Sequence, residues 1–205
     1  MTASGNPAIL AMDAAGGACS VALWASGGLV ARRFSAMARG QSERLVPMIA
    51  EVVAEWGGSF ETLDALAVTT GPGGFTGVRI GLATARGLAL ARRLPLLGIS
   101  SFEVSAAAST AAEREGRKVA AMIDSKRSDV FLQCFDAALR PLGPPGEVAR
   151  ARLADAVPAG PLLLTGDAAA SGLAGLRAVG RGGAAVAAAA GAADAAVLAA
   201  RAALR

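Results

Sequence analysis

The segment best suited to bind an anion is a glycine-rich loop between two regular elements. It reads Thr-Thr-Gly-Pro-Gly-Gly-Phe-Thr-Gly over residues 69–77 and joins a predicted strand to a predicted helix. Backbone N–H groups at a helix N-terminus attract phosphate, so Gly71, Gly73 and Gly74 are candidate nucleotide- or phosphate-proximal residues. The loop matches neither a Walker A motif nor a dinucleotide-binding G-x-G-x-x-G loop with its acidic partner. The sequence of the loop therefore favours a role in close packing over a role in phosphate binding.

A carboxylate at the end of the first predicted strand is the second candidate. Asp13 precedes a turn of small residues, Ala-Ala-Gly-Gly, and the next strand follows at once. Such a carboxylate can hold a metal-bound water beside a phosphate. The alternative is an ordinary hairpin with Asp13 satisfied by turn amides. The residues favour the hairpin, because Ser20 carries the only hydroxyl near the turn.

Acids and cations also share a predicted turn at residues 123–131. A carboxylate pair can do acid–base work, but Lys126 and Arg127 should keep Asp124 and Asp129 ionised. We expect a solvated hairpin here.

The residue types exclude several classes of site. Histidine is absent, which excludes Ser-His-Asp and Cys-His catalysis and every metal site that contains histidine. Cys19 and Cys134 form no C-x-x-C pair, so we expect two reduced thiols. We predict no catalytic residue and no metal ligand in this chain.

Composition and charge exclude further classes of protein. The 205 residues are 54% hydrophobic and 18% charged, which excludes intrinsic disorder. The net charge of +4 comes mainly from scattered arginines, so we do not expect the chain alone to bind nucleic acid. Residues 1–7 do not resemble a signal peptide, and residues 184–200 are too polar to span a bilayer. A cytoplasmic protein without a membrane partner is predicted.

The elements that must position these residues follow from hydrophobic periodicity. Strands are predicted at residues 9–12, 19–24, 29–35, 63–70 and 96–99, and helices at residues 42–56 and 76–93. After residue 100, helices are predicted at 102–112 and 192–204, and strands at 119–123, 130–135 and 162–165. The pattern is α/β, with a meander followed by a parallel crossover. We place a boundary near residue 100, giving an N-terminal lobe at 1–100 and a smaller C-terminal lobe at 101–205.

The second helix carries two stripes. Gly77, Gly81 and Ala85 recur every four residues, which lets another helix or a sheet approach closely. Arg79 and Arg86 lie seven residues apart on another face, typical of a solvated surface or of the rim of a protein interface.

Several of these segments together resemble the bacterial TsaB (YeaZ) family. The most specific is Gly-Pro-Gly-Gly-Phe-Thr-Gly-Val-Arg-Ile-Gly-Leu-Ala-Thr-Ala-Arg-Gly at residues 71–87. Others are Leu-Ala-Met-Asp at 10–13, Gln-Ser-Glu-Arg-Leu-Val-Pro-Met-Ile at 41–49 and Gly-Ile-Ser-Ser-Phe-Glu at 98–103. The resemblance covers residues 8–131 and is thin beyond them.

The resemblance implies an actin/Hsp70-like fold of two ribonuclease-H-like lobes, the second reduced. It implies a non-catalytic scaffold or activator subunit that pairs with the transferase TsaD, joined by the ATPase TsaE. Their complex forms N6-threonylcarbamoyladenosine at position 37 of tRNAs that read ANN codons, so tRNA is a substrate of the complex only. A homodimer is expected when the chain is alone, with ATP or ADP bound only at a subunit interface.

The resemblance also implies that two long helices form the partner interface. The residues predicted for it are Leu45, Met48, Ile49, Val52, Gly77, Val78, Gly81, Leu82, Ala85 and Arg86. The chain departs from the family where Ala14 and Ala15 replace common hydroxyl residues and where Gly40 occupies a frequent histidine position. These departures weaken the expectation that the chain binds a nucleotide by itself. A stand-alone ATPase or small-molecule kinase of the same fold remains the alternative.

Overall fold

The chain divides into two compact units, each built around one mixed sheet. The computed structural model describes residues 6–205. The chain up to Ser100 and residues Ala193–Arg205 make the first unit, and Ser101–Ala192 make the second.

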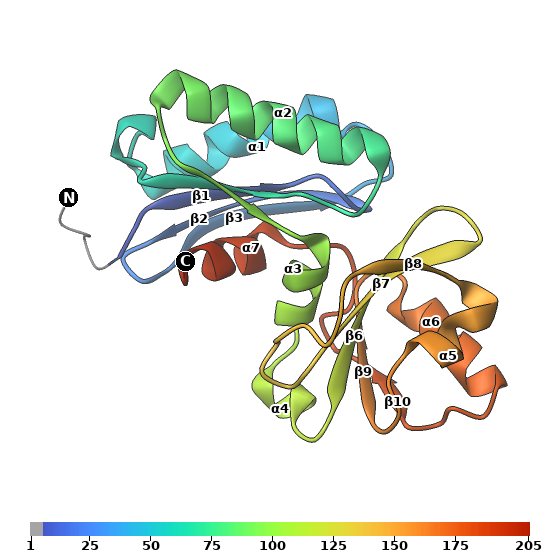
Figure 1. Ribbon diagram of the computed structural model, residues 1–205. Coiled ribbons are helices and arrows are strands. Elements are labelled where there is room, and N and C mark those ends of the chain that lie inside the picture. Colours follow the sequence, from blue (N-terminus) through green and yellow to red (C-terminus); the bar gives the residue numbers. More distant parts are fainter. Residues whose placement is uncertain (1–5) are drawn as a thin grey trace. The chain divides into compact units, whose positions relative to one another are not determined.

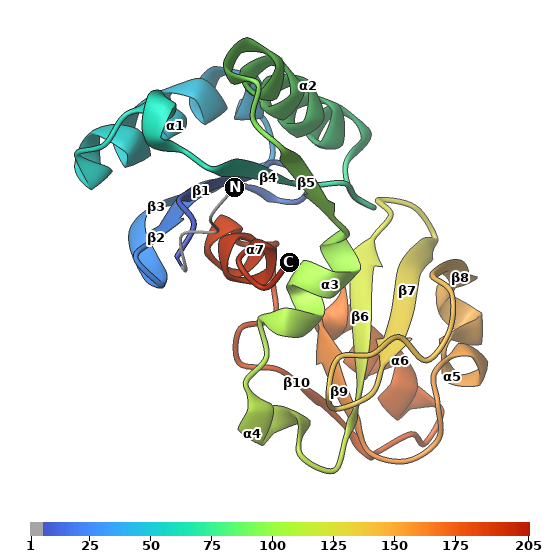
Figure 2. The same ribbon diagram turned by 60° about the vertical axis from the view of Figure 1, so that its left-hand side comes forward.

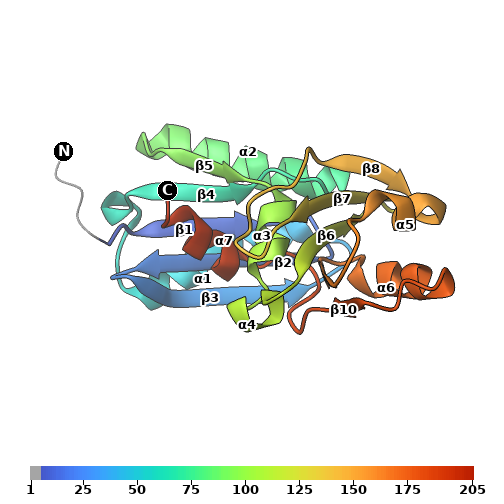
Figure 3. The same ribbon diagram turned by 60° about the horizontal axis from the view of Figure 1, so that its bottom comes forward.

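The first unit contains a five-stranded sheet in the order β3-β2-β1-β4-β5. β1 pairs antiparallel with β2 and β2 with β3, whereas β1, β4 and β5 run parallel. Figure 3 shows these strands side by side. The meander and the crossover predicted from the sequence are both present. The strands are β1 (Ile9–Asp13), β2 (Ala18–Ala25), β3 (Gly28–Ala36), β4 (Ala65–Thr69) and β5 (Leu96–Ile99).

Helices cover both faces of this sheet. α1 (Gln41–Trp56) and α2 (Phe75–Arg92) lie on one face, and α7 (Ala195–Ala202) lies on the other (Figures 1 and 2). A short 3₁₀ turn, Phe60–Thr62, links α1 to β4. Because both faces are covered, every residue of β1 and β4 is buried. This explains why those strands read as unbroken apolar runs.

The second unit repeats the same strand topology. Its sheet has the order β8-β7-β6-β9-β10, with antiparallel pairs on the β7 side and parallel pairs on the β9 side. The strands are β6 (Lys118–Asp124), β7 (Asp129–Phe135), β8 (Gly146–Ala149), β9 (Leu162–Thr165) and β10 (Ala184–Val186). Two mixed sheets flanked by helices confirm the predicted α/β class.

The helices of the second unit are shorter. α3 (Ser101–Ala107) packs on one face of the sheet through Phe102 and Ala106. On the other face, α5 (Leu153–Ala156) and α6 (Ala169–Ala178) enclose a second cluster with Leu153 and Leu176. A 3₁₀ turn, Arg150–Arg152, precedes α5, and α4 (Ala111–Arg114) follows α3.

Two predicted element boundaries change for identifiable reasons. The helix predicted at 102–112 is split, because Thr110 caps α4 by accepting the Glu113 N–H. α1 begins at Gln41 rather than at residue 42, and its cap is Gly40. Its φ of 93° favours glycine, and its carbonyl accepts the Glu43 and Arg44 N–H groups at 3.1 Å.

The final helix packs against a different unit from the one predicted from the sequence. The prediction assigned residues 193–205 to the second lobe, but α7 packs on the sheet of the first unit through Ala195, Leu198, Ala199 and Ala202. Alanine lets the helix approach this sheet closely. Within residues 6–205, no helix is both long and apolar enough to cross a membrane.

Candidate functional site

The turn after β1 is held by its own unit. Asp13 is fully buried and lies opposite Ser20 on β2. The Ser20 hydroxyl accepts a 3.0 Å hydrogen bond from the Ala195 N–H in the first turn of α7. The hydroxyl near this turn is therefore engaged in positioning a helix, as a structural hairpin requires.

The glycine loop packs directly on that turn. A Cβ on Gly73 would lie 2.2 Å from the Ala15 carbonyl oxygen, and one on Gly77 would lie 2.0 Å from that of Ala14. The Gly74 N–H donates to the Ala15 carbonyl at 2.7 Å. The structure thus brings the loop and the turn together through backbone contact. The Gly74 N–H group, a candidate phosphate donor, is already used.

The small-residue stripe of α2 faces the sheet of its own unit. Gly77, Gly81 and Ala85 are buried, and a Cβ on Gly81 would meet the Val68 side chain at 3.6 Å. Their role as partner-interface residues stays a prediction. The short side chains let α2 approach β4 and the turn after β1, so the stripe is needed for packing within the unit.

The four residues predicted for the interface on α1 are also core residues. Leu45, Met48, Ile49 and Val52 are at most 3% exposed and belong to the cluster between α1, α2 and the sheet. Their side chains are covered by their own unit, and their role at a partner interface also stays a prediction. Helical periodicity identified an apolar face, and that face is turned to the sheet.

Other residues form the exposed surface of the two helices. Val46, Phe75 and Leu90 are 58%, 68% and 83% exposed. The Arg79 guanidinium stacks 3.5 Å from the centre of the Phe75 ring, and Arg86 is exposed. We call Val46, Phe75, Arg79, Arg86 and Leu90 the outer helix surface. Of the predicted residues only Arg86 belongs to it, while Val78 and Leu82 are half-buried.

Sequence reasoning missed the apolar members of this surface. Val46 and Leu90 fall outside the periodic core stripes of their helices, and that mismatch was the available signal. Exposed large apolar side chains and an arginine-stacked aromatic ring are each typical of protein-binding surfaces.

The two helices also differ in charge. No acidic residue lies in α2, whereas α1 carries Glu51, bound by Arg44 at 2.7 Å and by Arg33 at 2.9 Å. The Arg44 hydrogen bond holds the pKa of Glu51 below its ordinary value. Glu51 and Glu55, which pairs with Arg33 at 2.6 Å, are thus engaged within the unit, and α2 presents net positive charge.

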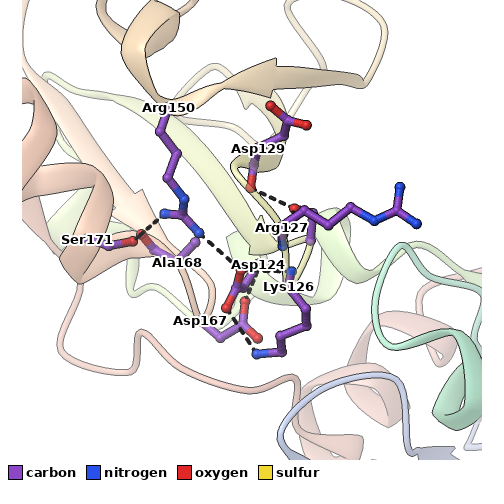
Figure 4. A network of polar contacts seen from close by, with 9 residues as sticks. Asp124, Lys126, Arg127, Asp129, Arg150, Asp167, Ala168 and Ser171 are labelled. Atoms are coloured by element: carbon purple, nitrogen blue, oxygen red, sulfur yellow. Dashed lines mark hydrogen bonds and ion pairs between the residues drawn. The ribbon is translucent and has the colours of Figure 1, made fainter.

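In the second unit, a polar network joins two strand ends (Figure 4). Asp124 at the end of β6 accepts hydrogen bonds of 3.0 Å from the backbone and ammonium groups of Lys126 and from Arg150. The Asp167 carboxylate accepts the Asp124 N–H at 2.8 Å. Arg150 also donates to Ser171 on α6, at 2.9 Å.

This network pairs acids differently from the sequence prediction. The second carboxylate beside Asp124 is Asp167, which follows the neighbouring parallel strand. Asp129 contributes its backbone carbonyl, which accepts the Ser125 hydroxyl at 2.7 Å. Burial opposes the ionisation of Asp124, but hydrogen bonds and charge from Lys126 and Arg150 lower its pKa. Burial raises the pKa of Asp167, and the Asp124 N–H only partly offsets it.

The two cysteines are free thiols of low reactivity. Cys19 is fully buried in the first unit, and Cys134 is half-buried in the second. Burial raises the pKa of each thiol to about 11. Among the described residues, no three His, Cys, Asp or Glu side chains gather as a metal site would need.

Comparisons with known proteins agree with this geometry. The family model of TsaD, tRNA N6-adenosine threonylcarbamoyltransferase, matches residues 27–143, more than half of the chain. The Escherichia coli "tRNA threonylcarbamoyladenosine biosynthesis protein TsaB" is 40% identical over 123 residues, covering 60% of this chain and 52% of the relative. The Haemophilus influenzae protein of the same name is 39% identical over 126 residues, covering 62% and 52%. The match thus spans about half the length of these curated relatives.

A solved structure extends the likeness to both units. YeaZ from Pseudomonas aeruginosa superposes with a TM-score of 0.77 at 29% identity, covering 97% of this chain and 91% of that one. This confirms the predicted actin-like fold of two ribonuclease-H-like lobes. The chain belongs to the family of the TsaD model, and the relatives and the solved structure that it resembles carry the names TsaB and YeaZ.

Proposed function

We propose that the chain is a non-catalytic subunit of the machinery that makes N6-threonylcarbamoyladenosine at position 37 of tRNAs reading ANN codons. The observation that carries this proposal is the 40% identity to the Escherichia coli TsaB protein over 123 residues. We infer a scaffold or activator role from the geometry of the site. The groups that could do chemistry are engaged in holding the fold.

The packing of the glycine loop supports a role without intrinsic nucleotide chemistry. Gly73 and Gly77 lie against the backbone of the turn after β1, and the Gly74 N–H is bonded to it. A phosphate would have to displace this contact, so the loop fits a phosphate poorly. We propose that ATP or ADP binds only where a partner subunit supplies further groups.

The outer helix surface supports a TsaD-like transferase as the principal partner. It combines exposed apolar side chains, Val46 and Leu90, with the stacked pair Phe75 and Arg79. Aromatic and arginine side chains dominate the binding energy of protein interfaces. We propose that a TsaD-like subunit covers this surface, that a second copy covers it when the chain is alone, and that a TsaE-like ATPase joins the assembly in the cytoplasm.

The test is to deplete the protein in its own cells and measure modified nucleosides in hydrolysed tRNA by mass spectrometry. We expect loss of threonylcarbamoyladenosine and its recovery when the chain is expressed again. Unchanged modification would contradict the proposal. Sustained phosphate release from ATP by the purified chain alone would instead favour the stand-alone ATPase or kinase.

A further inference from the structure

The second unit contains a hollow of about 380 Å³ on the face of the sheet that α5 and α6 cover. β7 and β8 form its floor, the loop around Pro144 forms one wall, and the end of α5 forms the other. The apolar residues that line it include Leu132, Cys134, Leu142, Val148, Val157 and Pro158. Small-molecule sites in proteins begin at about this size.

The hollow arises from a difference between the two units. In the first unit, α1 has 16 residues and packs over β2, so that Val21 and Leu23 are fully buried. In the second unit, a 3₁₀ turn of 3 residues and an α5 of 4 residues stand between the corresponding strands. They are too short to cover β7, so Cys134 remains half-buried at the floor.

The chemistry of the lining selects one kind of ligand. Leu132 and Val148 make the floor mainly apolar, and the Gln133 amide beside them donates to the Gly143 carbonyl at 3.3 Å. The Cys134 thiol is neutral at physiological pH because burial raises its pKa to about 11. Asp155 is the one charged residue that lines the hollow. Its partner Arg152, at 2.8 Å, lies outside the lining, and both side chains are largely exposed, so this pair is weakly held. An apolar group that carries a positive charge satisfies both the floor and the carboxylate.

We propose that the hollow binds a small apolar amine, with its hydrocarbon part on Leu132, Cys134 and Val148 and its ammonium group at Asp155. The amine replaces the exposed contact between Asp155 and Arg152 with a charge-assisted hydrogen bond at the edge of an apolar floor. A carboxylate of the same shape is disfavoured, because Asp155 repels it and no cation lines the hollow.

The test uses benzylamine, benzyl alcohol and benzoate as probes of one shape and different charge. Cys134 reports occupancy, since an occupant covers its thiol. Iodoacetamide modification of Cys134 in the full chain is followed by mass spectrometry. We expect benzylamine to slow it several-fold at saturation, benzyl alcohol to act only at higher concentration, and benzoate to have no effect. As a second readout, methyl NMR signals of Leu132, Val148 and Val157 should shift with benzylamine.

A matched pair of variants tests the role of the carboxylate. Asp155→Asn should raise the benzylamine concentration needed for half-protection about threefold, the usual contribution of an exposed ion pair. Glu115→Gln removes an exposed acid of the same unit away from the hollow and should change nothing. Equal protection by benzoate, or full protection of Asp155→Asn, would overturn the role of the charge. No change in Cys134 reactivity or methyl shifts with any probe would overturn the site itself.

Discussion

Single residues decide how closely α2 approaches its sheet. Gly77 admits no Cβ without displacing the Ala14 carbonyl, whereas a Cβ on Gly87 meets nothing within 4 Å. Gly77→Ala should therefore lower the free energy of unfolding by about 1–3 kcal/mol, the usual cost of overpacking. Gly87→Ala, in the same helix, should raise it by up to about 1 kcal/mol through helix propensity.

Urea unfolding followed by circular dichroism measures both glycine variants. If the two changes have the same sign, the close contact between α2 and the turn after β1 does not limit stability.

A prediction about binding concerns Leu90 on the outer helix surface. At 83% exposure, Leu90 contributes little to its own unit, so Leu90→Glu should fold normally. It should weaken binding to a TsaD-like partner at least tenfold, because it buries a charge in an apolar contact. Val179→Glu, at a 61% exposed residue of the second unit, is the control.

Titration calorimetry with the purified partner distinguishes these two variants. Normal binding of Leu90→Glu would place the interface elsewhere on the chain.

Asp167 provides a prediction on pH dependence. Its folded-state pKa is raised by burial, so its ionisation at neutral pH opposes folding. Asp167→Asn keeps an oxygen for the Asp124 N–H and should be more stable than the parent at pH 7. Well below the ordinary value of 3.8, where the carboxyl is protonated in both states, the difference should vanish. Melting temperatures across this range would contradict the prediction if the gain persisted in acid.

At the scale of the element, α7 is fixed at its first turn. Asp194 caps it by accepting the Ala196 N–H at 2.9 Å, and pairs with Arg32 at 2.5 Å. Asp194→Ala should cost about 1–2 kcal/mol, the range for loss of a helix cap. Asp194→Asn keeps the cap and should cost less. A double-mutant cycle of Asp194→Ala and Arg32→Ala measures the coupling free energy of the ion pair. If the two changes in unfolding free energy add, the ion pair does not contribute to stability.

Sequence reasoning found most elements but not what each helix packs against. The strands around Met12, Val68 and Leu163 were recognisable because buried strands are unbroken apolar runs. α6 was missed because its alanines and glycines give only a weak helical period. The stripe at Gly81 was identified correctly as a close-contact face, but the same spacing serves a sheet and a partner helix equally. Only the tertiary structure shows that α2 packs this face against its own sheet.

The network around Asp124 shows the same limit. Sequence proximity suggested Asp129 as its companion, whereas the parallel pairing of β6 with β9 brings Asp167 instead. Strand order was the missing information, and residue spacing alone could not supply it.

At the scale of the whole molecule, the two units share one strand topology, but the order of helices along the chain does not follow the division into units. α3 follows the last strand of the first unit yet belongs to the second, and α7 follows the last strand of the second unit yet belongs to the first. Both tryptophans, Trp24 and Trp56, lie in the first unit. Removing residues 193–205 should therefore alter tryptophan fluorescence and lower the melting temperature of the first unit, although all five of its strands precede residue 100.

That order of elements matters while the protein is being made. A ribosome completes all five strands of the first sheet before it starts the second unit, but the helix that covers one face of that sheet is translated only after the second unit. Until then, the nascent chain exposes the apolar surface that Leu198 and Ala199 later cover. A chain that ends anywhere between residues 100 and 193 therefore lacks the helix that covers this surface.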